Sequence, residues 1–451
     1  MKKNDEIIVT IQERSFPNKG IGYLEDNKII IKNTLVGQKV SAKISKKRNN
    51  AIEARLLNII EKAPYEIDSK CSHFDLCGGC SYQNIPYEQE LELKKEQVLT
   101  LLKNAEISDF QFEGIERSPN ETAYRNKCEF SFGDEEKGGQ LALGMRKRQS
   151  FYEVVNLKDC NIIDEDFLKI ISATVDFFRQ KQIPFYHKAR HDGQLRHLVV
   201  RKASATQELL VNLITTSEIT FSLKEWKETL LNLKLTGNIC GILHTSNDSV
   251  ADVVKSDETT LLFGRNYFVE KLFDLTFQVS TFSFFQTNSK GAEKLYSIVK
   301  EFAGDIKNKI VFDLYCGTGT IAQIISHNAK KVIGIEIVEE AIEAAKENAI
   351  RNQITNCEFI SGDVLKKVEE LSDKPDLIIL DPPRDGIHIK AIDKIIHFGA
   401  KEIIYVSCKP TSLARDLKIF QENGYKIEKI KLMDMFPRTV HIETIVLLTL
   451  I

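Results

Sequence analysis

The chain has 451 residues, with 62 Lys and Arg against 64 Asp and Glu and a formal net charge of -2. This length suffices for about two or three domains of ~150 residues each, and 42% hydrophobic and 28% charged residues are typical of a globular protein. No apolar run approaches the ~20 residues that a bilayer span needs, and the first residues lack the apolar core of a signal peptide. We therefore expect a cytoplasmic protein without a membrane partner.

The first sixty residues are basic. They contain twelve Lys and Arg and six Asp and Glu, a net of +6, so the remaining chain carries -8. Four Ile- and Val-rich segments, 6–16, 20–33, 38–47 and 51–60, alternate with turn-forming residues. This spacing predicts an OB-like β-barrel over residues 1–61. Its charge indicates an anionic partner, with a merely solvated surface as the alternative. The candidate contacts are Lys39, Lys43, Lys46, Lys47 and Arg48.

Residues 62–279 are predicted to form a central α+β domain, because helical patterns at 87–104, 164–181 and 221–233 interrupt strand-like segments. Near its start, three cysteines form a C-x5-C-x2-C cluster: Cys71, Cys77 and Cys80. An odd total of nine cysteines argues against a disulfide framework and favours metal or catalytic roles. On spacing alone, an iron–sulfur cube fits about as well as zinc, for which His73 or Cys128 could be a fourth donor.

Residues 280–451 are predicted to form the catalytic domain. From 308 onward, near-continuous apolar runs alternate with helical patterns such as 338–352, which is typical of a doubly wound α/β fold. Gly317 and Gly319 follow the first of these strands and allow close approach of the backbone to a ligand.

Acidic residues follow the next three strands. Glu336 ends the second strand, about twenty residues after the glycines, where it can accept hydrogen bonds from ribose hydroxyls. Asp363 follows the third strand, and Asp381-Pro382-Pro383 ends the fourth on a stiff turn. Together these elements resemble the class I, Rossmann-like fold of S-adenosylmethionine-dependent methyltransferases.

Two further strand ends indicate the reaction. Cys408 ends the fifth strand, and the neighbouring Lys409 and a helix that begins near Pro410 would favour a thiolate, although free cysteines are commonly small core residues. Glu443 is a solitary carboxylate in an apolar strand and could act as a general base. Thiolate addition at carbon 6 of a pyrimidine activates carbon 5 for methylation, and a base must then remove the proton from carbon 5. Methylation of an exocyclic amine, the alternative, would not need the thiol.

With these motifs the chain resembles the RNA uracil-5-methyltransferases. The resemblance rests on Cys408 in VSCKP, Asp381 in DPPR, Gln286 in FFQTN, the DLYCGTGT loop and the HIE at 441–443. It implies that Cys408 is the nucleophile and Glu443 the base. The methyl-donor contacts that it implies are Gln286, Tyr315, Glu336, Asp381, Asp363 and Thr320. Tyr315 and Thr320 stand where relatives often have Phe and Asn, and Thr320 is shorter than Asn.

The resemblance extends to the N-terminal half. The barrel is similar to a TRAM domain, and Cys71, Cys77, Cys80 and Cys160 are similar to the [4Fe–4S] ligands of the branch that methylates 23S ribosomal RNA. This implies a ribosomal RNA substrate, with transfer RNA as the alternative and a non-catalytic RNA-binding assembly factor as the alternative of another class. We expect a monomer.

Further RNA contacts are expected in the central part. The candidates are Tyr124, Arg125, Lys127, Arg146, Lys147, Arg148, Arg196, Arg201 and Lys202, of which Arg125 and Arg201 are favoured because they flank apolar strands. The three phenylalanines Phe282, Phe284 and Phe285 are expected to lie in the core rather than to stack on bases.

Overall fold

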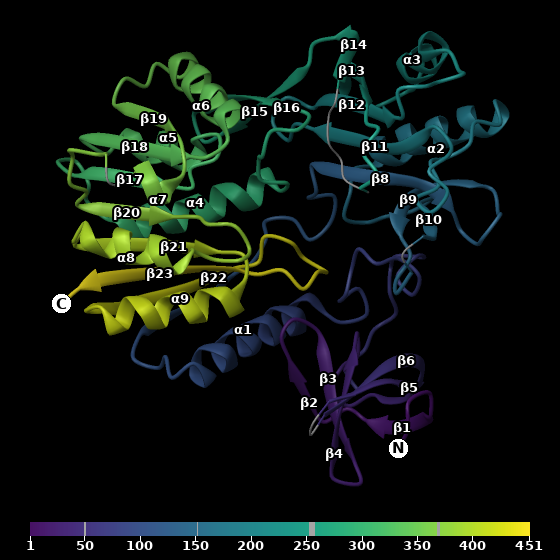
Figure 1. Ribbon diagram of the computed structural model, residues 1–451, viewed down its shortest axis with the longest axis horizontal. Coiled ribbons are helices and arrows are strands. Elements are labelled where there is room, and N and C mark those ends of the chain that lie inside the picture. The colour runs from purple at the N-terminus through teal and green to yellow at the C-terminus, as the bar shows by residue number, and fades with distance from the viewer. Residues whose placement is uncertain (49–50, 151, 252–257, 368–369) are drawn as a thin grey trace.

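The computed structural model describes residues 1–48, 51–150, 152–251, 258–367 and 370–451. It consists of an N-terminal β-domain, a central sheet and a C-terminal sheet, which are coloured purple, teal and green to yellow in Figure 1. Within the described residues, no helix is both long and apolar enough to cross a membrane.

The N-terminal domain is a six-stranded sheet in the order β1-β5-β6-β4-β3-β2. Its strands alternate between core and solvent: Ile7 and Val9 are buried, whereas Ile8 is 56% exposed. Because β1 also contacts β3, the sheet curls into a barrel around this core, as the sequence predicts. The strands are β1 (Glu6–Thr10), β2 (Glu13–Ser15), β3 (Lys19–Leu24), β4 (Asn27–Lys32), β5 (Lys39–Arg48) and β6 (Ala51–Glu61).

The central sheet has seven strands in the order β10-β9-β8-β11-β12-β13-β14. Two helices cover one face, where Phe167 and Trp226 share a core cluster with the strands. Asp164 and Ser222 cap the two helices with their side-chain oxygens. The elements are β8 (Lys127–Asp134), β9 (Leu141–Arg146), β10 (Val154–Asn156), α2 (Glu165–Gln180), β11 (Leu195–Lys202), β12 (Glu208–Thr215), α3 (Leu223–Leu231), β13 (Asn238–Ser246) and β14 (Glu258–Gly264).

The C-terminal sheet has eight strands in the order β19-β18-β17-β20-β21-β23-β22-β7. Strands β17 to β21 are parallel, and β23 is antiparallel to both of its neighbours. The elements are β17 (Ile310–Leu314), α5 (Thr320–Ser326), β18 (Lys331–Glu336), α6 (Glu339–Arg351), β19 (Cys357–Ser361), α7 (Val364–Lys367), β20 (Leu377–Leu380), α8 (Ile389–His397), β21 (Glu402–Ser407), α9 (Pro410–Glu422), β22 (Tyr425–Met433) and β23 (Glu443–Leu450).

Successive residues of these strands enter two different cores, one on each face of the sheet. Val311 packs in the core with α4 (Ser289–Ala303), α5 and α6, whereas Phe312 packs in the core with α8 and α9. Strands buried on both faces explain the near-continuous apolar runs. The strand order reverses between β17 and β20, and ligands bind outside the carboxyl ends of the strands at such a point.

The structure differs from the sequence-based expectation at the helix 87–104. We assigned this helix to the central domain 62–279, but α1 (Tyr87–Asn104) packs against α9 beneath the C-terminal sheet (Figure 1). β7 (Gln111–Glu116) then joins that sheet as the edge strand beside β22. The hairpin of β15 (Tyr267–Leu272) and β16 (Leu275–Ser280) connects the central sheet to α4.

Candidate active site

The first strand of the C-terminal sheet leads into a tight loop. After β17, the backbone of Tyr315 has a φ of 68°, and Gly317 and Gly319 have φ values of 53° and 69°. A Cβ atom on Gly319 would lie 2.5 Å from the Phe359 ring, so glycine is required there. The N–H groups of Tyr315 and Cys316 donate to the Ile335 carbonyl oxygen, so the loop is held in a fixed turn at the point where the strand order reverses.

Asp313 lies fully buried beneath this loop. One carboxylate oxygen accepts a hydrogen bond from the Ala322 N–H at 2.9 Å, and the other has no partner. Burial and the nearby Asp381 carboxylate raise the pKa of Asp313 to about 8. Our sequence analysis missed this residue, although an acid inside an apolar strand was a visible signal. It fixes the start of α5 against β17.

The predicted donor-site acids lie at neighbouring strand ends. The Glu336 carboxylate accepts hydrogen bonds from the N–H groups of Gly317 at 3.2 Å, Ile337 at 2.8 Å and Val338 at 3.0 Å. Asp363 accepts one from the Leu365 N–H at the start of α7. Glu336 is thus held beside the glycine loop, where it can meet ribose hydroxyls.

Thr320 and Gln286 approach the same loop. The Thr320 hydroxyl is buried 3.3 Å from that of Thr318, whose hydroxyl donates to the Phe284 carbonyl oxygen. The Gln286 side chain lies near Tyr296 of α4, where it opposes the rise that burial causes in the pKa of the phenol. The segment 284–286 therefore borders the glycine loop.

The aromatic residues before Gln286 differ from the expectation. Phe285 is buried as predicted, but Phe282 is 38% and Phe284 67% exposed, so placing these two in the core was wrong. The Phe284 ring lies 3.8 Å from where a Cβ atom on Gly317 would be. An exposed ring above a ligand-binding loop is available for stacking.

Asp381, Cys408 and Glu443 meet at the ends of adjacent strands. Asp381 directly follows β20 and Cys408 directly follows β21, its parallel neighbour. In the antiparallel pair of β21 and β23, Ser407 lies opposite Thr444, so Cys408 leaves the sheet beside Glu443. The topology thus brings together a thiol and two carboxyls that are far apart in the sequence.

Burial controls the protonation of these three groups. It raises the pKa of Asp381 to about 7. Burial and then Asp381 raise the pKa of Glu443 to about 8. For Cys408, burial, Glu443 and Asp381 raise the thiol pKa to about 11. A carboxyl tuned to the neutral range is suited to proton transfer.

The cation that opposes these shifts is Arg384, a residue that our sequence analysis quoted without a role. Arg384 lowers the pKa of both Cys408 and Glu443. Its backbone is held by a hydrogen bond from the Ser412 hydroxyl to the Arg384 carbonyl oxygen at 2.9 Å. The predicted neighbour Lys409 instead lies 3.9 Å from Asp385. Arg384, rather than Lys409, therefore favours the thiolate.

The four predicted cluster ligands gather at one end of the central sheet. Cys160 lies between Asp159, which accepts from the Ser72 N–H at 3.3 Å, and Asn161, which hydrogen-bonds Gln83 at 2.6 and 2.9 Å. These bonds hold Cys160 against the loop that contains the other three cysteines.

The thiols of this loop are close to one another and accept N–H donors. Burial and the neighbouring thiols of Cys77 and Cys71 raise the pKa of Cys80 to about 12. The Gly79 N–H donates to the Cys77 sulfur at 3.4 Å, and the Gln83 amide to the Cys80 sulfur at 3.6 Å. Such bonds stabilise thiolates. In the described part of the chain, no group of three His, Cys, Asp or Glu side chains is placed to hold a single metal ion. Four cysteine thiols with N–H donors to sulfur are the donor set that a [4Fe–4S] cluster takes.

Four of the expected RNA contacts have buried side chains: Tyr124, Arg196, Arg201 and Lys202. The Arg201 guanidinium donates to the carbonyl oxygens of Ser280, Thr281 and Ser283. Arg196 donates to carbonyl oxygens of the 247–251 turn, and Lys202 bonds Asp164 and Asp166. Fixed in this way, these cations connect segments of the fold.

The other predicted contacts differ in whether they are available to RNA. Lys46 and Lys47 of the barrel are exposed, and Lys39 pairs with Glu61 at 2.9 Å; the side chain of Arg48 lies outside what the structure describes. Arg148 donates to the carbonyl oxygens of Cys77 and Cys80, so it supports the cysteine loop.

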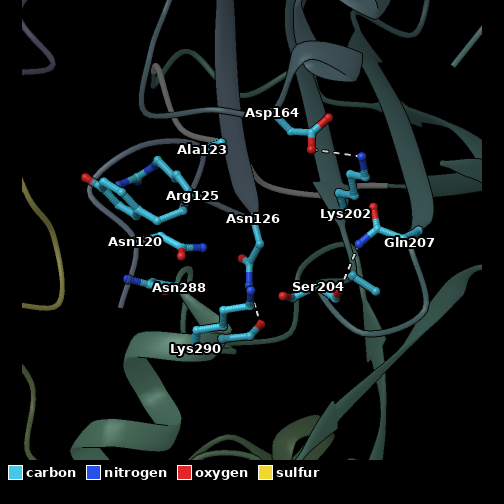
Figure 2. A pocket seen from close by; sticks show the side chains of 13 residues that line it. Asn120, Ala123, Arg125, Asn126, Asp164, Lys202, Ser204, Gln207, Asn288 and Lys290 are labelled. Atoms are coloured by element: carbon cyan, nitrogen blue, oxygen red, sulfur yellow. Dashed lines mark hydrogen bonds and ion pairs between the residues drawn. The ribbon is translucent and has the colours of Figure 1, made fainter. Parts of the chain in front are cut away.

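A polar cavity of about 170 Å³ lies between the central sheet and the start of α4 (Figure 2). Arg125 and Asn126 line one side, and Lys290 lines the floor on α4. Asn126 donates to the Gln286 carbonyl oxygen at 3.2 Å, so the cavity adjoins the segment that borders the glycine loop. The cavity is separate from the strand ends that carry Cys408 and Glu443. Arg125, however, is one of the cations that lower the pKa of His441, which lies near Glu443.

The strand order, the glycine loop and the acids at the strand ends define a class I S-adenosylmethionine-dependent methyltransferase. Residues 86–451 match the family model described as tRNA (Uracil-5-)-methyltransferase, and residues 2–57 match that of the TRAM domain. The chain belongs to the tRNA (uracil-5-)-methyltransferase family, and it is an S-adenosylmethionine-dependent RNA (uracil-5-)-methyltransferase.

Relatives extend over the whole chain. An uncharacterized RNA methyltransferase of Clostridium tetani is 51% identical over 99% of this chain and 98% of its own length. One of Caldanaerobacter subterraneus is 47% identical over 99% of both chains. The crystal structure of Pyrococcus abyssi tRNA (uracil-54, C5)-methyltransferase in complex with S-adenosyl-L-homocysteine is similar in fold. It has a TM-score of 0.78 and 24% identity, and the match covers 98% of this chain and 100% of that one.

Proposed function

We propose that the protein methylates carbon 5 of a uridine in 23S ribosomal RNA, with Cys408 as nucleophile and Glu443 as base. The observation that carries the assignment of roles is the meeting of Cys408, Glu443 and Asp381 at adjacent strand ends. The ribosomal target is supported by the combination of a TRAM barrel with a four-cysteine site, which the ribosomal branch of the family also has. The fold of the Pyrococcus enzyme favours transfer RNA as the second candidate.

S-adenosylmethionine, when bound, supplies an electrophilic methyl group. Gln286, Tyr315, Glu336 and Asp381 would hold it, with Asp363 and Thr320 at the margins. The Cys408 sulfur adds to carbon 6 of uracil, which makes carbon 5 nucleophilic. After carbon 5 is methylated, Glu443 takes the proton from carbon 5. That electron pair re-forms the double bond between carbons 5 and 6, and the sulfur leaves as a thiolate.

The four-cysteine site would hold a [4Fe–4S] cluster through Cys71, Cys77, Cys80 and Cys160. When present, the cluster supplies a cross-link between the cysteine loop and the 159–161 segment. Protein purified without oxygen should contain about four irons per chain and absorb in the visible range, and a Cys160→Ser variant should lose both. Colourless, iron-free, zinc-containing wild type would contradict this assignment.

The cavity of Figure 2 would lie on the path of the RNA. Arg125 and Lys290 bring positive charge to it, and the exposed Gln207 brings an amide group that suits base edges and phosphates. Lys290→Ala should therefore raise KM for RNA about fivefold and reduce the salt dependence of binding by roughly one counterion. Lys294→Ala, one turn along α4 and paired with Glu116, is the matched control.

The decisive experiment maps 5-methyluridine in ribosomal and transfer RNA from a deletion strain, with and without the restored gene. Loss of one or more 5-methyluridines from 23S RNA, rescued by wild type but not by Cys408→Ala, is expected. Loss confined to transfer RNA would shift the assignment to the second candidate. A Cys408→Ala variant that methylates normally would contradict the proposed chemistry, and a covalent complex with 5-fluorouridine RNA would support it.

A further inference from the structure

The loop 434–442 connects the last two strands of the catalytic sheet and leads directly into Glu443. It leaves and re-enters the sheet at one point, because Met433 and Glu443 are paired residues of β22 and β23. In Figure 1 this yellow loop extends from the sheet toward the segment that precedes α1. Arg438 is its central residue and has a φ of 69°. A non-glycine residue keeps this conformation only when its surroundings hold it there.

The backbone of Arg438 is bonded on both sides. Its N–H donates to the Glu90 carboxylate at 2.7 Å. Its carbonyl oxygen accepts from the N–H groups of Ser81 at 2.8 Å and Tyr82 at 3.1 Å, the two residues that follow Cys80. The middle of the 434–442 loop is thereby attached to the end of the loop that contains Cys71, Cys77 and Cys80.

The guanidinium of Arg438 strengthens the same attachment. It donates to the Ile85 carbonyl oxygen at 2.9 Å and to the Glu121 carboxylate at 2.9 Å, and it lies 5.4 Å from the centre of the Tyr87 ring. The side chain is 14% exposed. Charged hydrogen bonds sheltered in this way are among the stronger ones in proteins.

Beneath Arg438, buried charges join the loop to α1. Lys94 lies 2.8 Å from both Glu90 and Asp434, and all three side chains are at most 1% exposed. Lys94 thus binds the residue that begins the loop and the residue that accepts from Arg438. Removing a member of this group would leave a buried charge without its partner.

Further hydrogen bonds hold the loop on both sides of Arg438, including the part that leads to Glu443. The Thr439 hydroxyl donates to the Phe436 carbonyl oxygen at 2.7 Å and accepts from the His441 N–H at 3.2 Å. The Tyr124 hydroxyl donates to the Pro437 carbonyl oxygen at 2.8 Å. Between Arg438 and Glu443, hydrogen bonds thus hold Thr439 and His441 in place.

We propose that Arg438 is a positioning residue that attaches the loop before Glu443 to the turn after Cys80, so that the base is correctly placed only when the cysteine loop is folded. This inference rests on the proposed role of Glu443. It also gives the cysteine site a function in a reaction that transfers no net electrons: it maintains the turn to which the catalytic loop is bound.

The test compares Arg438→Ala and Arg438→Lys with Arg117→Ala. Arg117 is a matched control because it also bonds Glu121 and lies over the Tyr87 ring, but its other side-chain bond is to Glu88 and not to the loop. The first readout is the release of tritium from RNA labelled at carbon 5 of its uridines, together with the amount of covalent Cys408–RNA adduct. The second is amide hydrogen exchange of residues 79–85 and 434–442.

We expect Arg438→Ala to slow tritium release about tenfold, to accumulate adduct, and to leave KM for S-adenosylmethionine within about twofold of wild type. Exchange should rise in both segments. Arg438→Lys should recover part of both effects, and Arg117→Ala should resemble wild type. Should the alanine variant not fold, the same two readouts on Arg438→Lys decide.

Unchanged tritium release, or faster exchange in 434–442 without a change in 79–85, would overturn the proposal. Glu443→Gln serves as the reference: it should accumulate adduct and release no tritium. If Glu443→Gln releases tritium normally, the proposed role of Glu443 fails. If it does not but Arg438→Ala behaves as wild type, only the role of Arg438 fails.

Discussion

The protonation of Glu443 should set the pH dependence of methyl transfer, and Arg384 should set its midpoint. Burial and Asp381 raise the pKa of Glu443 to about 8, and Arg384 opposes this shift. A base must be ionised to accept a proton. About a tenth of Glu443 is ionised at pH 7, about half at pH 8 and about nine-tenths at pH 9. Proton removal from carbon 5 should therefore accelerate about tenfold between pH 7 and pH 9.

Removing Arg384 tests the cause of the midpoint. Without this cation the carboxylate loses a favourable interaction, so the pKa of Glu443 must rise. Since Arg384 is exposed to solvent, we expect a shift of about half a unit to one unit. Arg384→Ala should then remove the carbon 5 proton several-fold more slowly at pH 7 and at nearly the wild-type rate at pH 9.5. Arg384→Lys should keep most of the wild-type midpoint.

The assay is single-turnover release of tritium from carbon 5 between pH 6 and pH 9.5 with saturating RNA and S-adenosylmethionine. Glu428→Gln in β22 is the matched control, because Glu428 lies in the same sheet but bonds Lys426 and Thr449. Its profile should equal that of wild type. A wild-type rate independent of pH over this range would refute the reasoning, as would an Arg384→Ala midpoint that stays in place or moves to lower pH.

Three further predictions follow from buried groups. Gly319→Ala should lower the free energy of unfolding by about 2–4 kcal/mol and abolish S-adenosylmethionine binding, because its Cβ would lie 2.5 Å from Phe359 and its φ is 69°. The control is Gly304→Ala, which has a φ of 59° and nothing within 4 Å of its Cβ. It should lower the free energy of unfolding by only about 1–2 kcal/mol. Denaturant titrations followed by circular dichroism compare the two, and equal costs would contradict the steric argument. Lys94→Ala should cost about 3–5 kcal/mol, since it leaves buried carboxylates unpaired; in the same titration, a cost below about 1 kcal/mol would show that the ion pairs are not stabilising. Because the pKa of Asp313 is raised to about 8 in the folded chain, this carboxyl contributes stability at pH 4, and the contribution is lost as the pH rises through about 8. Asp313→Asn should therefore flatten the decline of stability between pH 5 and pH 8. An unchanged slope would contradict this reasoning.

The strands of the C-terminal sheet could be predicted from the local sequence alone. Runs buried on both faces are apolar throughout, so strands such as β17 and β20 are visible without their partners. The backbone conformation of the loop after β17 requires glycine, so these glycines could be recognised in the sequence. The position of a residue such as Cys408 at the end of a strand indicated that it lies at the site. Because parallel strands place their carboxyl ends along one edge, such motifs predicted a shared site before any contact was known.

Tertiary structure alone decided which charges were available to substrate. Arg201 and Arg196 resemble RNA contacts in the sequence, but carbonyl oxygens from distant segments surround them in the fold. Arg384 and Arg438 carried no local signal, because the function of each depends on groups far away in the chain: Glu443 for the first, Ser81 and Glu90 for the second. A cation has the same pattern in a sequence whether it faces solvent or a buried acceptor, and only the packing of distant segments determines which.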